Sequence, residues 1–135
     1  DYSGTSTGVL ADYYLGCIAL KKGELEEAAK KFSGYDSEAF LVQARAYALA
    51  GDAYSDLGKT EEAITYYVKA TKSKPTKEYT PGYIIKLALA YENADKISDA
   101  VIEYEKFVAN YPNDQKIDDV YRYLAKAREL ASKKK

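Results

Sequence analysis

A pattern of small and aromatic residues recurs in this sequence after 35 and then 37 residues, and it constrains the fold more than any other feature. The middle copy is the most complete and reads YALAGDAYSDLGKTEEAITYYVKATKSKP, from Tyr47 to Pro75. Four of its positions are Gly51, Ala63, Tyr67 and Ala70. The later copy has Ala88, Ala100, Tyr104 and Phe107 at these positions. The earlier copy has Gly16, Ala28 and Phe32 at the first three of them. Such a period is typical of repeat proteins, in which each unit buries its apolar face against its neighbours.

The residue types at these positions predict two packed helices in each copy. Gly16 and Gly51 lack a side chain, so they let the first helix of a copy press closely against the second. Alanines such as Ala63 do the same from the second helix, and the aromatic residues fill the gaps between copies. Pro75 and Pro112 end the second helices, because proline lacks the backbone donor and clashes with the preceding turn. We therefore predict an all-α fold.

The repeat also predicts where the elements lie. We expect three helical hairpins at about residues 7–33, 37–75 and 80–112, then a capping helix with a polar outer face at about residues 116–133, all within a single domain at residues 1–135. The second hairpin is expected to begin at Ser37. In the third, Thr80 is expected to cap the first helix and Pro81 to occupy its first turn. The first hairpin is shorter, because Gly34 ends its second helix early and no proline follows.

Over nearly its whole length the sequence resembles the tetratricopeptide-repeat (TPR) family, and the middle copy quoted above carries the resemblance most clearly. The resemblance implies a right-handed solenoid whose concave face is lined mainly by the first helix of each hairpin. It also implies that this face holds a peptide or a helix of another protein, and that the chain has no catalytic activity.

A narrower resemblance rests on segments such as LADYYLGCIALKKGELEEAAKKF and the ending VYRYLAKA. They look like bacterial, Bacteroidetes-type TPR proteins that carry an N-terminal membrane anchor and are similar in layout to the ancillary TPR subunit of the Sec translocon. Because the chain contains no methionine and opens on Asp1, we expect it to derive from a longer protein. The resemblance would place it on the periplasmic side of the inner membrane; otherwise it is cytoplasmic.

Alignment to the repeat places ten residues on the predicted concave face. They are Tyr13, Cys17, Leu20, Ala48, Asp52, Ser55, Ile85, Leu89, Glu92 and Tyr121. A row of apolar side chains on this face would be a patch suited to a partner. The same residues can instead pack inside the fold, and the sequence leaves both alternatives open. Asp52 would repel the carboxylate of a chaperone tail, so a clamp of that kind is not expected.

Composition excludes several classes of function. The chain has 20 basic and 21 acidic residues, so its balanced charge gives no reason to expect a nucleic acid or an anionic membrane as partner. It has no histidine and a single cysteine, Cys17, which removes His-based metal sites, internal disulfides and nucleophile–histidine pairs. No apolar run approaches the roughly 20 residues of a membrane span. We expect no metal, no cofactor, no enzymatic activity and no direct membrane insertion by this fragment.

Three other signals have structural interpretations. Gly58-Lys59-Thr60 looks like the end of a phosphate-binding loop, but Ala53 occupies the position of the required glycine, so a tight turn with Thr60 as helix cap is favoured. Carboxylate pairs such as Glu61-Glu62 fall in the first turn of a predicted helix, where the macrodipole favours negative charge. Cys17 is interpreted as a small apolar filler, although Lys21 could activate its thiol.

Two functions follow from these expectations. The leading one is a non-catalytic scaffold that binds a peptide or a partner helix in its concave groove. The alternative is a structural module for self-association, in which an apolar face pairs with a second copy to form a homo-oligomer within a membrane-anchored envelope assembly.

Overall fold

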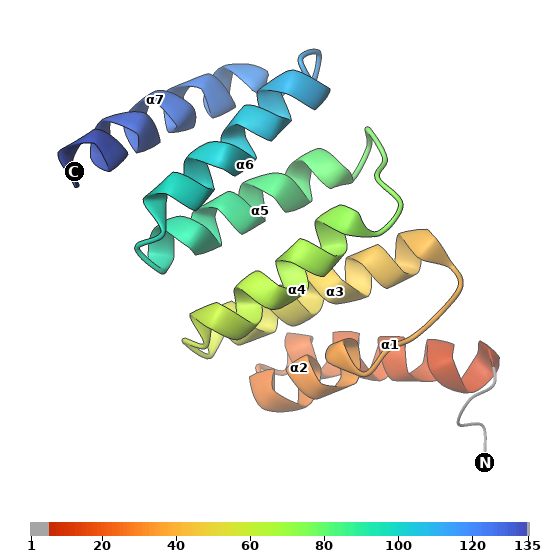
Figure 1. Ribbon diagram of the computed structural model, residues 1–135. Helices are drawn as coiled ribbons and strands as arrows, with labels where there is room; N and C mark the ends of the chain where they lie inside the picture. The colour runs from red at the N-terminus through yellow and green to blue at the C-terminus, as the bar shows by residue number, and fades with distance from the viewer. Residues whose placement is uncertain (1–5, 135) are drawn as a thin grey trace. The chain divides into compact units, whose positions relative to one another are not determined.

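The structure of the chain, a computed structural model, describes the backbone of residues 6–134 and the side chains of residues 10–134. Within these residues it contains seven α-helices and no strand (Figure 1). They are α1 (Ser6–Lys21), α2 (Leu25–Ser33), α3 (Phe40–Asp56), α4 (Thr60–Lys72), α5 (Thr80–Asn93), α6 (Ile97–Asn110) and α7 (Ile117–Lys133). The predicted all-α class of paired helices is confirmed. The chain divides between Lys74 and Pro75 into two compact units, which are described separately.

The first unit consists of α1 to α4, two helical hairpins that pack against each other through α2 and α3. Its core is a cluster of alanines and aromatic side chains. Ala28 and Phe32 of α2 share this cluster with Ala46, Ala50 and Ala53 of α3. The distance between two packed helices depends on the side chains at their contact. The alanines of this core therefore allow α2 and α3 to lie close together.

Two glycines allow the helices of a hairpin to approach closely, as the sequence predicts. A Cβ atom at Gly51 would lie 2.5 Å from the ring of Tyr67, and one at Gly16 would lie 2.8 Å from the ring of Phe32. Protein interiors have no room for such contacts, so a larger residue would displace the aromatic ring. The equivalent position in the third hairpin is Ala88, which is fully buried.

A buried glutamine holds the link between the two hairpins of the first unit. Oε1 of Gln43 accepts the backbone N–H of Ser37 at 2.6 Å, and Nε2 of Gln43 donates to the carbonyl of Tyr35 at 3.1 Å. These bonds hold the segment before α3 in a non-helical conformation. As a result, α3 begins at Phe40, three residues after the expected start at Ser37. Gln43 thus fixes the end of the short first hairpin, where no proline is present.

Each hairpin turn contains one residue in the left-handed region of backbone conformation. Gly23 has φ +76°, Gly58 has φ +78°, and the equivalent residue of the third hairpin, Asp95, has φ +60°. Glycine adopts this conformation without steric cost, whereas aspartate carries some strain there. Gly58 therefore serves a tight turn between two helices, and the phosphate-loop interpretation, which needs a preceding strand, has no structural support.

The two predicted threonine caps are wrong. α4 begins at Thr60 and α5 begins at Thr80, but neither start has a side-chain capping hydrogen bond. Oγ1 of Thr80 instead accepts the backbone N–H of Thr76 at 2.7 Å, so this side chain bonds back to the preceding loop. Pro81 lies in the first turn of α5, as expected.

The second unit consists of α5, α6 and α7, with α6 packed against both of the other helices. Large buried side chains of α6 form its core with one face of α7. The residues involved include Tyr104, Phe107, Val120, Leu124 and Ala127. Unlike the core of the first unit, this one has bulky side chains on both facing helices.

Candidate protein-binding surface

In the first unit, the predicted binding residue Tyr13 is anchored in the aromatic core. Its ring centroid lies 5.7 Å from that of Phe32 and 5.6 Å from that of Tyr35. Its hydroxyl accepts a 3.0 Å hydrogen bond from Nε of Arg45, which lies on α3. Burial, followed by the nearby Cys17, raises the pKa of Tyr13. The half-buried Tyr13 thus links the first helices of two neighbouring hairpins.

The other two predicted residues of α1 are also half-buried. Cys17 carries a free thiol, and together with Leu20 it packs against the core cluster of the first unit. Each side chain therefore contributes to internal packing and leaves only part of its surface for a partner. Their positions are compatible with both alternatives from the sequence, contact with a partner and packing inside the fold.

On α3, Asp52 forms a short bond within its own hairpin. Its Oδ1 accepts a 2.5 Å hydrogen bond from the hydroxyl of Tyr67, which is buried on α4. Burial first, and then the bond to Asp52, raises the pKa of Tyr67. Of the two remaining predicted residues of α3, Ala48 is buried and Ser55 is exposed.

The second unit contributes four predicted residues. Ile85 is half-buried against the core, whereas Leu89 on α5 and Tyr121 on α7 are exposed by 46% and 51%. Glu92 accepts a 2.5 Å hydrogen bond at Oε2 from the hydroxyl of Tyr104, and burial followed by this bond raises the pKa of Tyr104. Glu92 thus repeats in the third hairpin the role of Asp52 in the second.

Arg45 is not among the residues predicted for the concave face, although its position in the repeat could have indicated it. Arg45 lies three residues before Ala48 and seven before Asp52, a spacing that puts all three on one side of α3. Its exposed guanidinium is attached to Tyr13 through one N–H and has five N–H donors in all. The structure therefore joins Tyr13 and Arg45 in the first unit.

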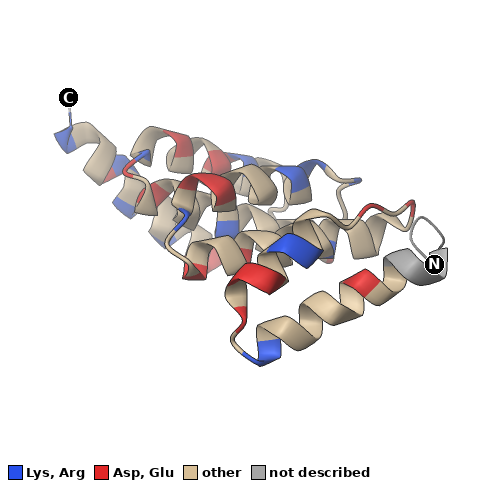
Figure 2. Cartoon of the chain, turned by 90° about the horizontal axis from the view of Figure 1, so that it is seen from below, with Lys and Arg blue, Asp and Glu red and all other residues tan. Residues whose placement is uncertain are grey.

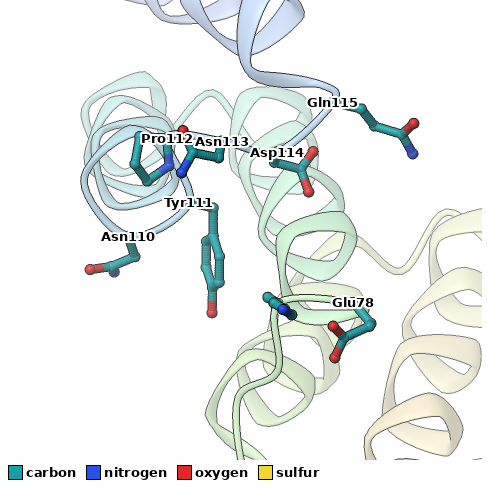
Figure 3. A pocket seen from close by; sticks show the side chains of 8 residues that line it. Glu78, Asn110, Tyr111, Pro112, Asn113, Asp114 and Gln115 are labelled. Carbon is teal, nitrogen blue, oxygen red and sulfur yellow. The ribbon is translucent and has the colours of Figure 1, made fainter.

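An open depression of about 540 Å³ lies in the second unit (Figure 3). It is formed by the chain just before α5 and by the loop between α6 and α7. Tyr111 and Pro112 contribute its apolar wall, while Lys77, Glu78 and Asp114 supply charges of both signs. Because apolar, basic and acidic side chains are mixed in this lining, it does not indicate a particular class of ligand.

Residues 6–134 include no cluster of three side chains suited to hold a metal ion. None of the helices in that range combines the length and the apolar character of a membrane span.

Comparison with protein families identifies the repeat. Models of the tetratricopeptide repeat match residues 44–77 and residues 84–114. This chain is a tetratricopeptide-repeat protein. The TPR segments correspond to α3 and α4 and to α5 and α6, with their adjoining loops. A comparison with curated proteins gave no match. TPR repeats generally mediate protein–protein interactions and are generally non-catalytic, so the surface residues of this TPR protein are considered as contacts for another protein.

Proposed function

We propose that this TPR protein is a non-catalytic scaffold that binds a peptide or a helix of another protein through the first helices of its hairpins. The hydrogen bond between Arg45 and Tyr13 is the observation that carries the proposal. Arginine and tyrosine are enriched among the residues that dominate binding energy in protein interfaces. A guanidinium already held by an anchored tyrosine loses less side-chain freedom when a partner binds.

The chemistry of this surface indicates the kind of segment that it would take. The remaining donors of Arg45 are suited to a carboxylate of the partner, because guanidinium and carboxylate groups form paired hydrogen bonds. In the second unit, Leu89 offers an exposed apolar side chain next to the half-buried Ile85 on α5. We therefore expect acidic side chains in a segment that binds the first unit and apolar side chains in a segment that binds the second.

The test compares partner capture by full-length variants in the native organism. Arg45→Glu and Leu89→Arg change exposed side chains, so we expect them to stay folded and to lose the captured partner. Ile102→Arg is the matched control, since Ile102 is 47% exposed on the second helix α6. Tyr13→Ala is unsuitable, because it would also remove ring contacts in the core. Equal capture by wild type and both surface variants, with circular dichroism unchanged, would overturn the proposal.

Two finer predictions from the sequence belong with this proposal. The organisation as a single domain stays a prediction, and so does the layout of a membrane-anchored bacterial protein. Self-association, the alternative function, is favoured by one specific surface, the exposed apolar face of α1.

A further inference from the structure

Among the residues whose side chains the structure describes, the outer face of α1 is an exposed apolar stripe. Leu10, Tyr14, Leu15 and Ile18 are exposed by 42%, 57%, 47% and 49%. Figure 2 shows α1 as a largely uncharged helix, and only two of its 16 residues are charged. Most surface helices present charged groups opposite their buried face. We refer to these four residues, with the exposed Ala11 between them, as the α1 stripe.

The repeat shows what this face does elsewhere in the first unit. Positions 11, 15 and 18 of α1 correspond, 35 residues later, to Ala46, Ala50 and Ala53 of α3. All three alanines are fully buried, in one cluster with Ala28 and Phe32 of α2. The face that α3 uses to receive a neighbouring helix is therefore the face that α1 leaves exposed.

The second unit repeats this arrangement at its last helix. Val120, Leu124 and Ala127 of α7 lie 74 residues after the three alanines of α3, and they are at most 4% exposed. They pack in the core formed with α6. Seven of the 17 residues of α7 are charged, so its remaining surface is suited to water. Of α1, α3 and α7, only α1 has this helix-receiving face exposed. The side chains on this face of α1 are also larger than the alanines of α3.

We propose that a second copy of this chain covers the α1 stripe, with α1 packed antiparallel against α1 of the second copy around a two-fold axis. A two-fold interface brings the same face together from both copies, so any charged residue on that face would be buried twice, once from each copy. The α1 stripe contains no charged residue, which removes that penalty. Antiparallel pairing also places the helix dipoles in a favourable orientation.

The order of residues along the stripe suits this pairing. With the axis passing between Tyr14 and Leu15, Tyr14 of one copy lies beside Leu15 of the other. Ile18 of one copy then lies beside Ala11 of the other, so that a large side chain meets a small one. Alternation of large and small residues lets facing layers interdigitate.

The area of the stripe sets the expected strength of the dimer. Its large side chains leave on the order of 350 Å² exposed on each copy, if a whole large side chain presents roughly 150–250 Å². With the surrounding atoms, two copies would bury about 1,000 Å² in total, which is less than stable interfaces bury and is typical of weak, transient ones. The dimer should therefore be weak and should dissociate on dilution.

Sedimentation equilibrium of the chain over a wide concentration range tests the proposal. We expect a reversible monomer–dimer equilibrium, with a dissociation constant that Ile18→Glu raises on the order of tenfold or more, because it buries an unpaired carboxylate. Ile102→Glu is the matched control, since Ile102 has a similar exposure of 47% and lies on α6, outside the stripe. A strict monomer at all concentrations overturns the proposal, and so does an equal effect of the two variants. A strict monomer would leave the face to a helix from elsewhere.

Cross-linking tests the antiparallel geometry. In a Cys17→Ala background, Tyr14→Cys should form a disulfide between copies under mild oxidation, because the two residues lie near the axis. Leu10→Cys should not, since its two copies would be separated by about 13 Å along the helices. Two cysteines can be bridged only when their Cα atoms lie within roughly 7 Å. Cross-linking of Leu10→Cys alone, or of neither variant, would overturn the pairing.

The α1 stripe is distinct from the residues proposed to bind a partner through Arg45 and Leu89. Arg45→Glu and Leu89→Arg lie outside the α1 stripe, so their effect on partner capture and the effect of Ile18→Glu on self-association can be told apart.

Discussion

The hydroxyl of Tyr67 on α4 donates a 2.5 Å hydrogen bond to Oδ1 of Asp52 on α3. The same pairing occurs in the third hairpin between Tyr104 and Glu92, although Glu92 lies one helical turn beyond the position equivalent to Asp52. The first hairpin has Phe32 in place of these tyrosines, and the two matching positions on α1 are the apolar Cys17 and Leu20. The two hairpins that have a tyrosine hydroxyl on the second helix thus also have a carboxylate on the first helix to accept its hydrogen bond, and the hairpin with Phe32 has neither.

Removing the hydroxyl of Tyr67 should weaken the second hairpin. Tyr67→Phe keeps the ring over Gly51 but leaves Asp52 without this donor, so we expect the free energy of unfolding to fall by about 1–2 kcal/mol. Urea unfolding followed by circular dichroism measures the change. Tyr54→Phe is the control, because Tyr54 stacks on Tyr66 and lies at the edge of the core, and it should change stability by less than about 0.5 kcal/mol. Equal effects of the two variants would show that the Asp52 bond contributes nothing.

The raised pKa values of Tyr67 and Tyr104 predict a loss of stability in alkali. In the unfolded chain a tyrosine ionises near pH 10, so the unfolded state loses these protons before the folded state does. The stabilisation is therefore complete below about pH 10 and declines as the pH rises from there towards the folded pKa. The decline is at most about 1.4 kcal/mol per pH unit for each tyrosine.

Urea unfolding between pH 8 and pH 11.5 measures this dependence. The double variant Tyr67→Phe/Tyr104→Phe should show a shallower decline above pH 10 than wild type. A parallel decline in both proteins would mean that other groups cause the alkaline loss.

The contact between Gly51 and Tyr67 predicts that even one methyl group is too large. In Gly51→Ala the new Cβ would lie 2.5 Å from the ring, so Tyr67 must move and its bond to Asp52 should lengthen or break. We expect a loss of about 1–3 kcal/mol, as for other overpacked cores. Gly82→Ala is the control: Gly82 is helical, and a Cβ there meets nothing within 4 Å, so thermal unfolding should show no loss. Retained stability in Gly51→Ala would contradict the close approach.

The repeat in the sequence was sufficient to predict the helical hairpins, because their packing depends on residue size at fixed spacing. Gly51 and Tyr67 are an example, since the missing side chain and the ring that covers it both occur at repeat positions. The role of Gln43 could not be predicted in this way. Its two bonds join a side chain to non-helical backbone, and that contact follows from the local path of the chain and has no counterpart in the repeat.

The candidate site was predicted only in part for a related reason. Alignment puts Asp52 and Leu89 at the same repeat position, yet Asp52 is bonded inside its hairpin and Leu89 is exposed. Whether a residue at such a position faces a partner depends on which side chains reach it from the neighbouring helix. Arg45 shows the reverse case: its spacing places it on one side of α3 with Asp52, but its bond to Tyr13, 32 residues earlier, could not be predicted from that spacing.

The hairpin turns offer a last prediction in which two substitutions have opposite signs. Gly58 has φ +78° and a Cβ there would meet nothing within 4 Å, so Gly58→Ala acts through backbone strain alone and should cost roughly 1–2 kcal/mol.

Asp95 occupies the equivalent turn with φ +60°, so Asp95→Gly should relieve strain. It also removes an exposed ion pair with Lys134, and surface pairs contribute little. We expect a net gain of up to about 1 kcal/mol, reduced by the greater freedom of glycine in the unfolded chain. Thermal unfolding of both variants beside Asp95→Asn, which loses the charge of the ion pair but keeps a residue that tolerates positive φ, separates the two effects. A loss of stability in Asp95→Gly as large as that in Asp95→Asn would show that the ion pair outweighs the strain.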